Sequence, residues 1–295
     1  MDQQSPLQQF ANAAQAAPSL WRLLAAIAVI AVGLLLTGLA IGALALAFDF
    51  ASADIVSGFE TPLSALIFLA SFLIWRPAIW VAMRLFCQRP YRTVFGPTGR
   101  VNVSQFLNGL FIAALFATLS TVIAWLLVGA PVISAPSVMM WLGFAVIAIP
   151  LVYFQSSAEE LLFRGLILQH MAARFSAFWA WALAPSLLFG LLHWQPDGYG
   201  PGAWMVLCVT GVTGLAFALI TAATGNLGLA MGLHFGLNVF ALLLIAPNDQ
   251  FAGLALAYWP LDDDQFLKLL TIDLAAVTFG CFIAGWMYKR SQLSP

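Results

Sequence analysis

Long apolar runs, separated by short polar stretches, cover most of the chain. They occupy residues 21–48, 62–86, 106–129, 138–173, 178–193, 203–223, 227–246 and 266–288. A helix needs roughly 20 apolar residues to cross the hydrocarbon core of a bilayer. The pattern therefore predicts an all-α membrane protein, a polytopic bundle of about eight transmembrane helices.

The order of these runs divides the chain into four segments. Residues 1–20 form an N-terminal segment, 21–137 hold the first three helices, 138–246 form a core of helices four to seven, and 247–295 hold an outer loop, the eighth helix and a C-terminal tail. The N-terminal segment lacks a basic n-region, and the apolar run after it is too long for a secretory signal. We therefore expect the first span to be retained.

The fourth run, at 138–173, is too long for one straight span. Pro150 is expected to kink it, and the part beyond Ile167 is expected to run into the membrane interface. Small residues at four-residue spacing predict where helices pack closely. They occur as a pair in the first run and a ridge in the seventh, at Gly38, Gly42, Gly228, Gly232 and Gly236.

Charged residues predict the orientation in the membrane. With the N-terminus placed in the cytoplasm, most basic residues fall on the inner side and most acidic residues on the outer side. Because Lys and Arg accumulate in cytoplasmic loops, both termini are expected to be cytoplasmic. Lys268 opposes the rule, and the sequence does not decide whether Arg76 faces the bundle or snorkels. The inner basic residues are Arg22, Arg84, Arg89, Arg92, Arg100, Arg174, Lys289 and Arg290; the outer acidic ones are Asp49, Asp54, Glu60, Asp197, Asp249, Asp262, Asp263 and Asp264.

The composition agrees with a membrane protein. Hydrophobic residues make up 62% of the chain and charged residues only 8%, whereas about a quarter of a soluble domain is charged. The formal net charge of −1 gives no reason to expect a nucleic-acid partner. Cys87, Cys208 and Cys281 lack disulfide or metal-ligand spacing, so we interpret them as small hydrophobic residues in the membrane.

Against this apolar background, Glu159, Glu160 and Arg164 are the most unusual residues. A carboxylate in hydrocarbon is expensive, so such groups are functional-site hypotheses by default. Glu160 and Arg164 are spaced to pair on one helix. Glu159 lies about 100° around that helix, which leaves it free for another task. A structural ion pair alone would explain one glutamate but not the other.

Four further polar groups lie in later apolar runs. His193 ends the fifth run, His234 and Asn238 lie on one face of the seventh, and Asp273 lies in the eighth, where we expect it near the interface. A carboxylate, two imidazoles and a carboxamide in one cavity suit the activation of water and the stabilisation of an oxyanion. The structural alternatives are an interfacial histidine for His193 and interhelical hydrogen bonding for His234 and Asn238.

These residues resemble the motifs of the CAAX-processing and bacteriocin-processing (CPBP) intramembrane proteases, also called the Abi or type II CAAX endopeptidase family. That family carries EExxxR, FxxxH and HxxxN or HxxxD on separate helices. The chain has Glu159 and Glu160 with Arg164, then Phe189 with His193, then His234 with Asn238, in this order and without a departure. The resemblance covers about residues 138–246.

The resemblance implies a proteolytic site. Glu159 would activate water with help from His193, His234 and Asn238 would bind the oxyanion, and Arg164 would hold Glu160. We interpret Phe189 as a packing residue.

No metal or other cofactor is expected, because the chain has no HExxH pair. A zinc-dependent protease that uses Glu159, His193 and His234 stays open as an alternative. The implied partners are the lipid bilayer and a membrane-anchored or hydrophobic peptide substrate. Neither the cleavage sequence nor the oligomeric state follows from the sequence.

The short loops favour a bacterial inner-membrane protein. Two other function classes fit the composition. A transporter would use the charged groups for an ion path, but the paired repeats typical of transporters are not visible. A non-catalytic membrane scaffold would have little reason to keep the full set of polar groups.

Overall fold

The computed structural model describes residues 4–47 and 59–293. Its main helices are α1 (Pro6–Ala11), α2 (Leu20–Ala47), α4 (Pro62–Ser71), α5 (Trp75–Ala82), α6 (Val103–Val128), α7 (Val138–Glu160), α8 (Gln169–Arg174), α9 (Ala184–Leu191), α10 (Pro196–Tyr199), α11 (Ala203–Thr224), α12 (Gly228–Val239) and α13 (Asp263–Leu293). Shorter helical segments join or extend them: η1 (Asn12–Ala16), η2 (Phe72–Ile74), η3 (Met83–Cys87), η4 (Tyr91–Phe95), η5 (Leu161–Leu168), η6 (Trp179–Leu183), η7 (Gly200–Gly202), η8 (Phe240–Leu244) and η9 (Asp249–Leu254).

The predicted fold class is confirmed. In the described part of the chain, six continuous helical stretches are long and apolar enough to cross a membrane: Leu20–Ala47, Pro62–Cys87, Val103–Val128, Val138–Arg174, Pro196–Thr224 and Asp263–Leu293. The shorter apolar helices Trp179–Leu191 and Gly228–Leu244 account for the other two expected runs. Phe48, Asp49 and Asp54, which entered the sequence predictions, lie outside the described residues.

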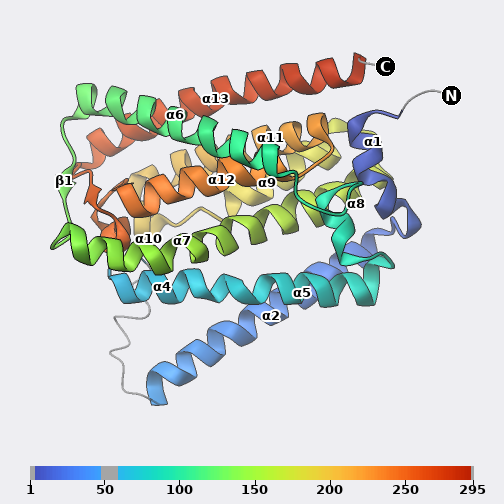
Figure 1. Ribbon diagram of the computed structural model, residues 1–295, viewed down its shortest axis with the longest axis horizontal. Helices are drawn as coiled ribbons and strands as arrows, with labels where there is room; N and C mark the ends of the chain where they lie inside the picture. Colours follow the sequence, from blue (N-terminus) through green and yellow to red (C-terminus); the bar gives the residue numbers. More distant parts are fainter. Residues whose placement is uncertain (1–3, 48–58, 294–295) are drawn as a thin grey trace.

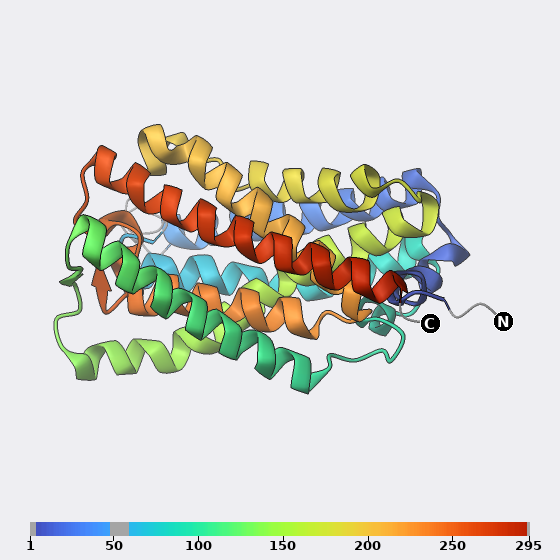
Figure 2. The same cartoon turned by 90° about the horizontal axis from the view of Figure 1, so that it is seen from above.

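The long helices run roughly along the long axis of the molecule (Figures 1 and 2). Helix α1 and the end of α13 lie at one end of the bundle, as an even number of crossings requires. Many large apolar side chains point outward, including Leu46, Leu126 and Phe282. An outer surface of this kind suits helices that face lipid.

A small sheet at the other end was not expected from the sequence (Figure 1). Strand β3 (Ala257–Tyr258) pairs antiparallel with β1 (Val132–Ile133) and parallel with β2 (Ile245–Ala246). The strands are too short to stand out in an apolar pattern. They join the loop between α6 and α7 to the loop before α13.

Capping residues and glycines define where the helices begin and end. Ser137 accepts a hydrogen bond from the backbone of Met140 and starts α7, and Asn102 starts α6 in the same way. Gly225 adopts a left-handed conformation with φ 65°, which ends α11 and turns the chain into α12.

The glycine ridge of α12 packs directly against α6. A Cβ added at Gly228 would lie 2.5 Å from the Asn102 carbonyl oxygen, and one at Gly232 would overlap the Phe106 carbonyl oxygen. The close approach predicted for this ridge is therefore confirmed. The prediction for Gly38 and Gly42 is wrong within the described residues, because an added Cβ there would meet nothing within 4 Å. The same spacing marks a packing face only where a partner helix is present.

The fourth run forms α7, η5 and α8 in succession. Helix α7 continues through Pro150 to Glu160, and the hydrogen bonding then widens to a π-helix in η5. Segments of π-helix occur frequently at functional sites. This π-helical segment begins directly after Glu159 and Glu160.

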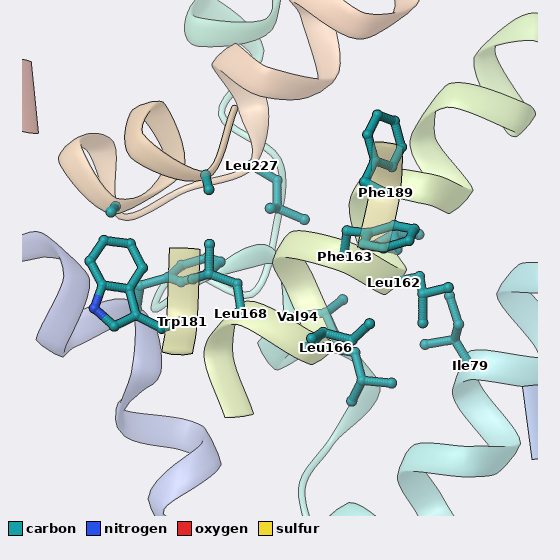
Figure 3. Packing of buried hydrophobic residues seen from close by; sticks show 14 of the residues in the cluster. Ile79, Val94, Leu162, Phe163, Leu166, Leu168, Trp181, Phe189 and Leu227 are labelled. Carbon is teal, nitrogen blue, oxygen red and sulfur yellow. The ribbon is translucent and has the colours of Figure 1, made fainter. Parts of the chain in front are cut away.

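Segment η5 lies at the centre of the main apolar core (Figure 3). All of its residues are buried, and its apolar side chains belong to one core cluster with side chains from several other segments. These neighbours include Ile79, Val94, Trp181, Phe189 and Leu227. The segment that follows the glutamate pair is thus fully enclosed by the bundle.

Two arginines attach other elements to the α7–η5–α8 stretch. Arg76 of α5 donates to the Ser157 hydroxyl at 2.6 Å and lies over the rings of Tyr153 and Phe154, so it faces the bundle. Arg89 donates to the Gln169 side chain and to the Gly165 carbonyl oxygen. Burial lowers the pKa of Arg89 to about 10, which leaves the guanidinium charged at neutral pH.

Candidate active site

The two adjacent glutamates lie at the end of α7 and have different surroundings. Glu160 is fully buried, and its Oε1 accepts a hydrogen bond from the Arg164 guanidinium at 2.8 Å. The pair expected from the spacing is therefore present. Arg164 also donates to the Gly214 carbonyl oxygen of α11 at 2.9 Å and lies over the ring of Phe189 at 4.8 Å. Arg164 thus compensates Glu160 and joins α7, α9 and α11.

His234 of α12 lies between the two carboxylates. Its Nδ1 is 2.8 Å from Glu160 Oε1, and its Nε2 is 3.4 Å from Glu159 Oε2. An ionised carboxylate only accepts hydrogen bonds, so Nδ1 is the donor to Glu160. This contact fixes the ring and directs the other nitrogen toward Glu159. The sequence predicted that His234 belongs to the site, but it did not predict that His234 contacts both glutamates.

Gln155 connects Glu159 to Asn238 and was missed in the sequence analysis. Its Nε2 donates to Glu159 Oε1 at 2.8 Å, and its Oε1 accepts from Asn238 Nδ2 at 2.8 Å. Glu159 Oε2 is buried and has no hydrogen-bond partner within the described residues. The feature of the sequence that could have indicated Gln155 is its position one helical turn before Glu159. Its partner Asn238 is 83 residues away, so no local pattern revealed the link.

His193 lies in the turn directly after α9, the helix that contains Phe189. Its Nδ1 lies 2.8 Å from the Phe189 carbonyl oxygen. A carbonyl oxygen only accepts, so Nδ1 carries the proton, and Nε2 of the neutral ring is an acceptor. The Phe189 ring is buried against His193 and His234, with ring centroids 4.7 and 6.0 Å away. The interpretation of Phe189 as a packing residue agrees with these contacts.

One cavity of about 350 Å³ joins groups from the fifth and seventh predicted helices. Its lining includes His193, His234 and Asn238. Glu159 lies directly behind this wall, in contact with His234 and with Gln155. Most of the remaining lining is apolar, from α6, α11 and α13. The site thus combines a polar cluster with an apolar chamber.

Residues 134–240 match the family described as type II CAAX prenyl endopeptidase Rce1-like. This part of the chain is similar to the Rce1-like family. A Bacillus subtilis (strain 168) protein described as uncharacterized protein YyaK is 28% identical over 232 residues, which cover 75% of this chain and 74% of that protein. No solved structure matches. The resemblance stated from the motifs is confirmed, and it supports a general role as an intramembrane protease.

The matched residues 134–240 contain every catalytic and supporting residue expected from the sequence, together with Gln155. Asp273 and Ser120, which also line the cavity, lie outside the matched residues. Asp273 follows the start of α13 by ten residues, about 15 Å along the helix, and lines the chamber. Its position relative to the membrane interface stays a prediction.

The alternative of a zinc site fits the geometry of these side chains poorly. Both ring nitrogens of His234 face glutamate oxygens, and Nδ1 of His193 is held by the Phe189 carbonyl oxygen. Across the described ranges, no three His, Cys, Asp or Glu side chains are grouped to hold a metal ion. We therefore derive no reaction step through a metal.

Proposed function

We propose that the chain is an intramembrane endopeptidase in which Glu159 activates a water molecule to hydrolyse a peptide bond. The observation that carries this proposal is the position of His234 between Glu159 and Glu160, on the wall of a cavity that His193 and Asn238 share. The match to the CAAX endopeptidase family supports the same reaction class.

The two glutamates have separate tasks in this proposal. Glu160 receives the guanidinium of Arg164 and the ring of His234 on one oxygen, so its charge is compensated. Glu159 receives one carboxamide hydrogen bond on Oε1, from Gln155, and its Oε2 has no hydrogen-bond donor in the described part of the chain. A carboxylate with a free oxygen is the better general base.

The reaction begins when Glu159 takes a proton from water as the water oxygen attacks the carbonyl carbon. Nε2 of His193 accepts a hydrogen bond from the second O–H of this water, which keeps its hydrogen, and so orients the water molecule. The carbonyl oxygen becomes an oxyanion. Glu159 then gives its proton to the amide nitrogen, the C–N bond breaks, and the amine leaves.

Asn238 and His234 stabilise the oxyanion in this scheme. One N–H of the Asn238 carboxamide is bonded to Gln155, which leaves the second for the substrate. Nε2 of His234 lies beside Glu159, 3.4 Å from Oε2, and a proton transferred to this nitrogen would make it a second donor to the oxyanion. Loss of one oxyanion donor typically costs about 10²–10³ in kcat.

Cleavage of membrane-anchored peptides by the purified protein tests the proposal. The wild type, reconstituted in liposomes, should cleave members of a peptide library with and without a metal chelator. Glu159→Gln should remove cleavage, whereas Glu60→Gln makes the same change at an exposed position and should leave it intact. The proposal fails if the wild type cleaves no peptide, or if it instead conducts ions across the liposome membrane.

A further inference from the structure

Asp273 is a partly buried carboxyl group that the proposed reaction does not use. It lies on α13 and lines the same cavity as His193, His234 and Asn238. Its Oδ1 accepts a hydrogen bond from the Ser120 hydroxyl of α6 at 3.0 Å. This hydrogen bond joins α13 to α6, and the carboxyl group lies in the wall of the chamber.

Among the described residues, no Lys or Arg forms an ion pair with this carboxylate. The cavity lining, which lies wholly in the described part of the chain, includes no Lys or Arg. The two histidines of the lining belong to the polar cluster, where His234 is held by the glutamates and His193 by the Phe189 carbonyl oxygen. An isolated charge inside a membrane protein is costly and usually marks a place where a substrate or ion binds.

The walls around Asp273 are apolar. Phe116, Leu269, Leu270 and Val277 line the cavity on α6 and α13. A chamber of this composition suits an extended apolar ligand that carries one charged group, which Asp273 can bind. The polar cluster and Asp273 are therefore two anchoring points for a single ligand.

We propose that Asp273 binds a basic group of the substrate, a lysine or arginine side chain or a free amine, while the peptide bond lies at Glu159. This inference rests on the proposed function, because it assigns specificity to the same cavity. Asp273 lies outside the region that matches the CAAX endopeptidase family, so the preference for a basic group belongs to this chain rather than to the family match.

A purely structural role for Asp273 makes a different prediction. If Asp273 only joins α13 to α6, the uncharged variant Asp273→Asn should still join the two helices. Its side-chain oxygen can still accept the hydrogen bond from the Ser120 hydroxyl. If Asp273 binds a cation, this substitution removes the recognition. Ser120→Ala makes the reverse change, since it removes the interhelical hydrogen bond and keeps the charge.

Binding of short acylated peptides to the full-length Glu159→Gln protein in lipid nanodiscs separates these roles without requiring cleavage. The peptides differ at one position, which carries Lys, norleucine or Glu and is moved along the sequence. We expect the best Lys peptide to bind at least about tenfold more tightly than its norleucine counterpart, the size of one hydrogen bond to a charged group. Asp273→Asn should remove this difference, and Ser120→Ala should retain it.

Several results would overturn the assignment: no binding of any peptide, equal affinity for Lys and norleucine, a preference for Glu, or a Lys preference that survives in Asp273→Asn. Parallel cleavage assays with wild-type Glu159 keep the two proposals apart. Binding that depends on Asp273 without cleavage would contradict only the proposed protease activity. Cleavage that depends on Glu159 without a Lys preference would contradict only the role of Asp273.

Discussion

At the scale of single residues, adjacent glutamates of the same type have different surroundings. The spacing predicted that Glu160 pairs with Arg164 and that Glu159 stays available, and the structure contains that pair. The link through Gln155 could not be predicted, because a carboxamide in an apolar helix is ambiguous and its partner Asn238 lies on another helix. Local spacing thus predicted contacts within one helix, whereas contacts between helices required the fold.

Gln155 should act as a positioning residue. Gln155→Leu removes the donor to Glu159 and the acceptor for Asn238, and the loss of one or two hydrogen bonds of about 1.5 kcal/mol each should lower kcat roughly tenfold to a hundredfold. KM should change little, because Gln155 is not among the residues that line the cavity. The measurement is steady-state cleavage kinetics. Ser156→Ala is the control, since its hydroxyl bonds only to its own helix; an equal loss there would argue against a specific role for Gln155.

Arg164 should matter for stability as well as for activity. Arg164→Met leaves Glu160 buried without its cation, and removal of one partner of a buried ion pair costs about 3–5 kcal/mol. The thermal denaturation midpoint in detergent should fall clearly. The double variant Arg164→Met/Glu160→Gln should recover part of that loss, because the uncompensated charge is gone. A double variant less stable than Arg164→Met would contradict this explanation.

At the scale of helices, a comparison of α12 with α2 shows what the spacing of glycines predicts and what it does not. Both carry glycines at four-residue spacing, yet only those of α12 meet another backbone. That contact lets α12 present His234 and Asn238 to α7 from its other face. The pattern predicted which residues share a face, and the partner of that face became known only from the structure.

Gly232→Ala should therefore destabilise the protein far more than Gly38→Ala. The added methyl group at Gly232 would overlap the backbone of α6, and overpacking typically costs about 1–3 kcal/mol. At Gly38 it would meet open space, so stability should be unchanged or slightly higher. Thermal denaturation of the two variants in the same detergent makes the comparison. Equal midpoints would show that α6 and α12 do not pack as described.

At the scale of the whole molecule, α1 and the end of α13 lie at the same end of the bundle (Figure 1). Alternation of apolar runs predicted this arrangement, because an even number of crossings returns the chain to its starting side. The strands β1 to β3 were not predictable, since two-residue strands leave no period in the sequence. Which end faces the cytoplasm stays a prediction from the arginines.

Reporter fusions in a bacterial host test that orientation. A fluorescent protein that folds only in the cytoplasm should be bright when fused after Pro295 and dark when fused within the loop near Asp249. Alkaline phosphatase, which is active only outside the cytoplasm, should give the opposite pattern. Phosphatase activity at the C-terminus would reverse the predicted topology.

The account as a whole depends on Glu159 as the general base, and a single-turnover rate measures this most directly. The protein in nanodiscs is saturated with a cleavable peptide, and the first bond cleavage is followed for the wild type, Glu159→Gln and Glu60→Gln. General-base catalysis contributes about 10²–10⁴ in rate, so Glu159→Gln should fall by at least about a hundredfold while peptide affinity and thermal stability stay near those of Glu60→Gln. A folded Glu159→Gln protein that cleaves within about threefold of the wild-type rate would contradict the central claim.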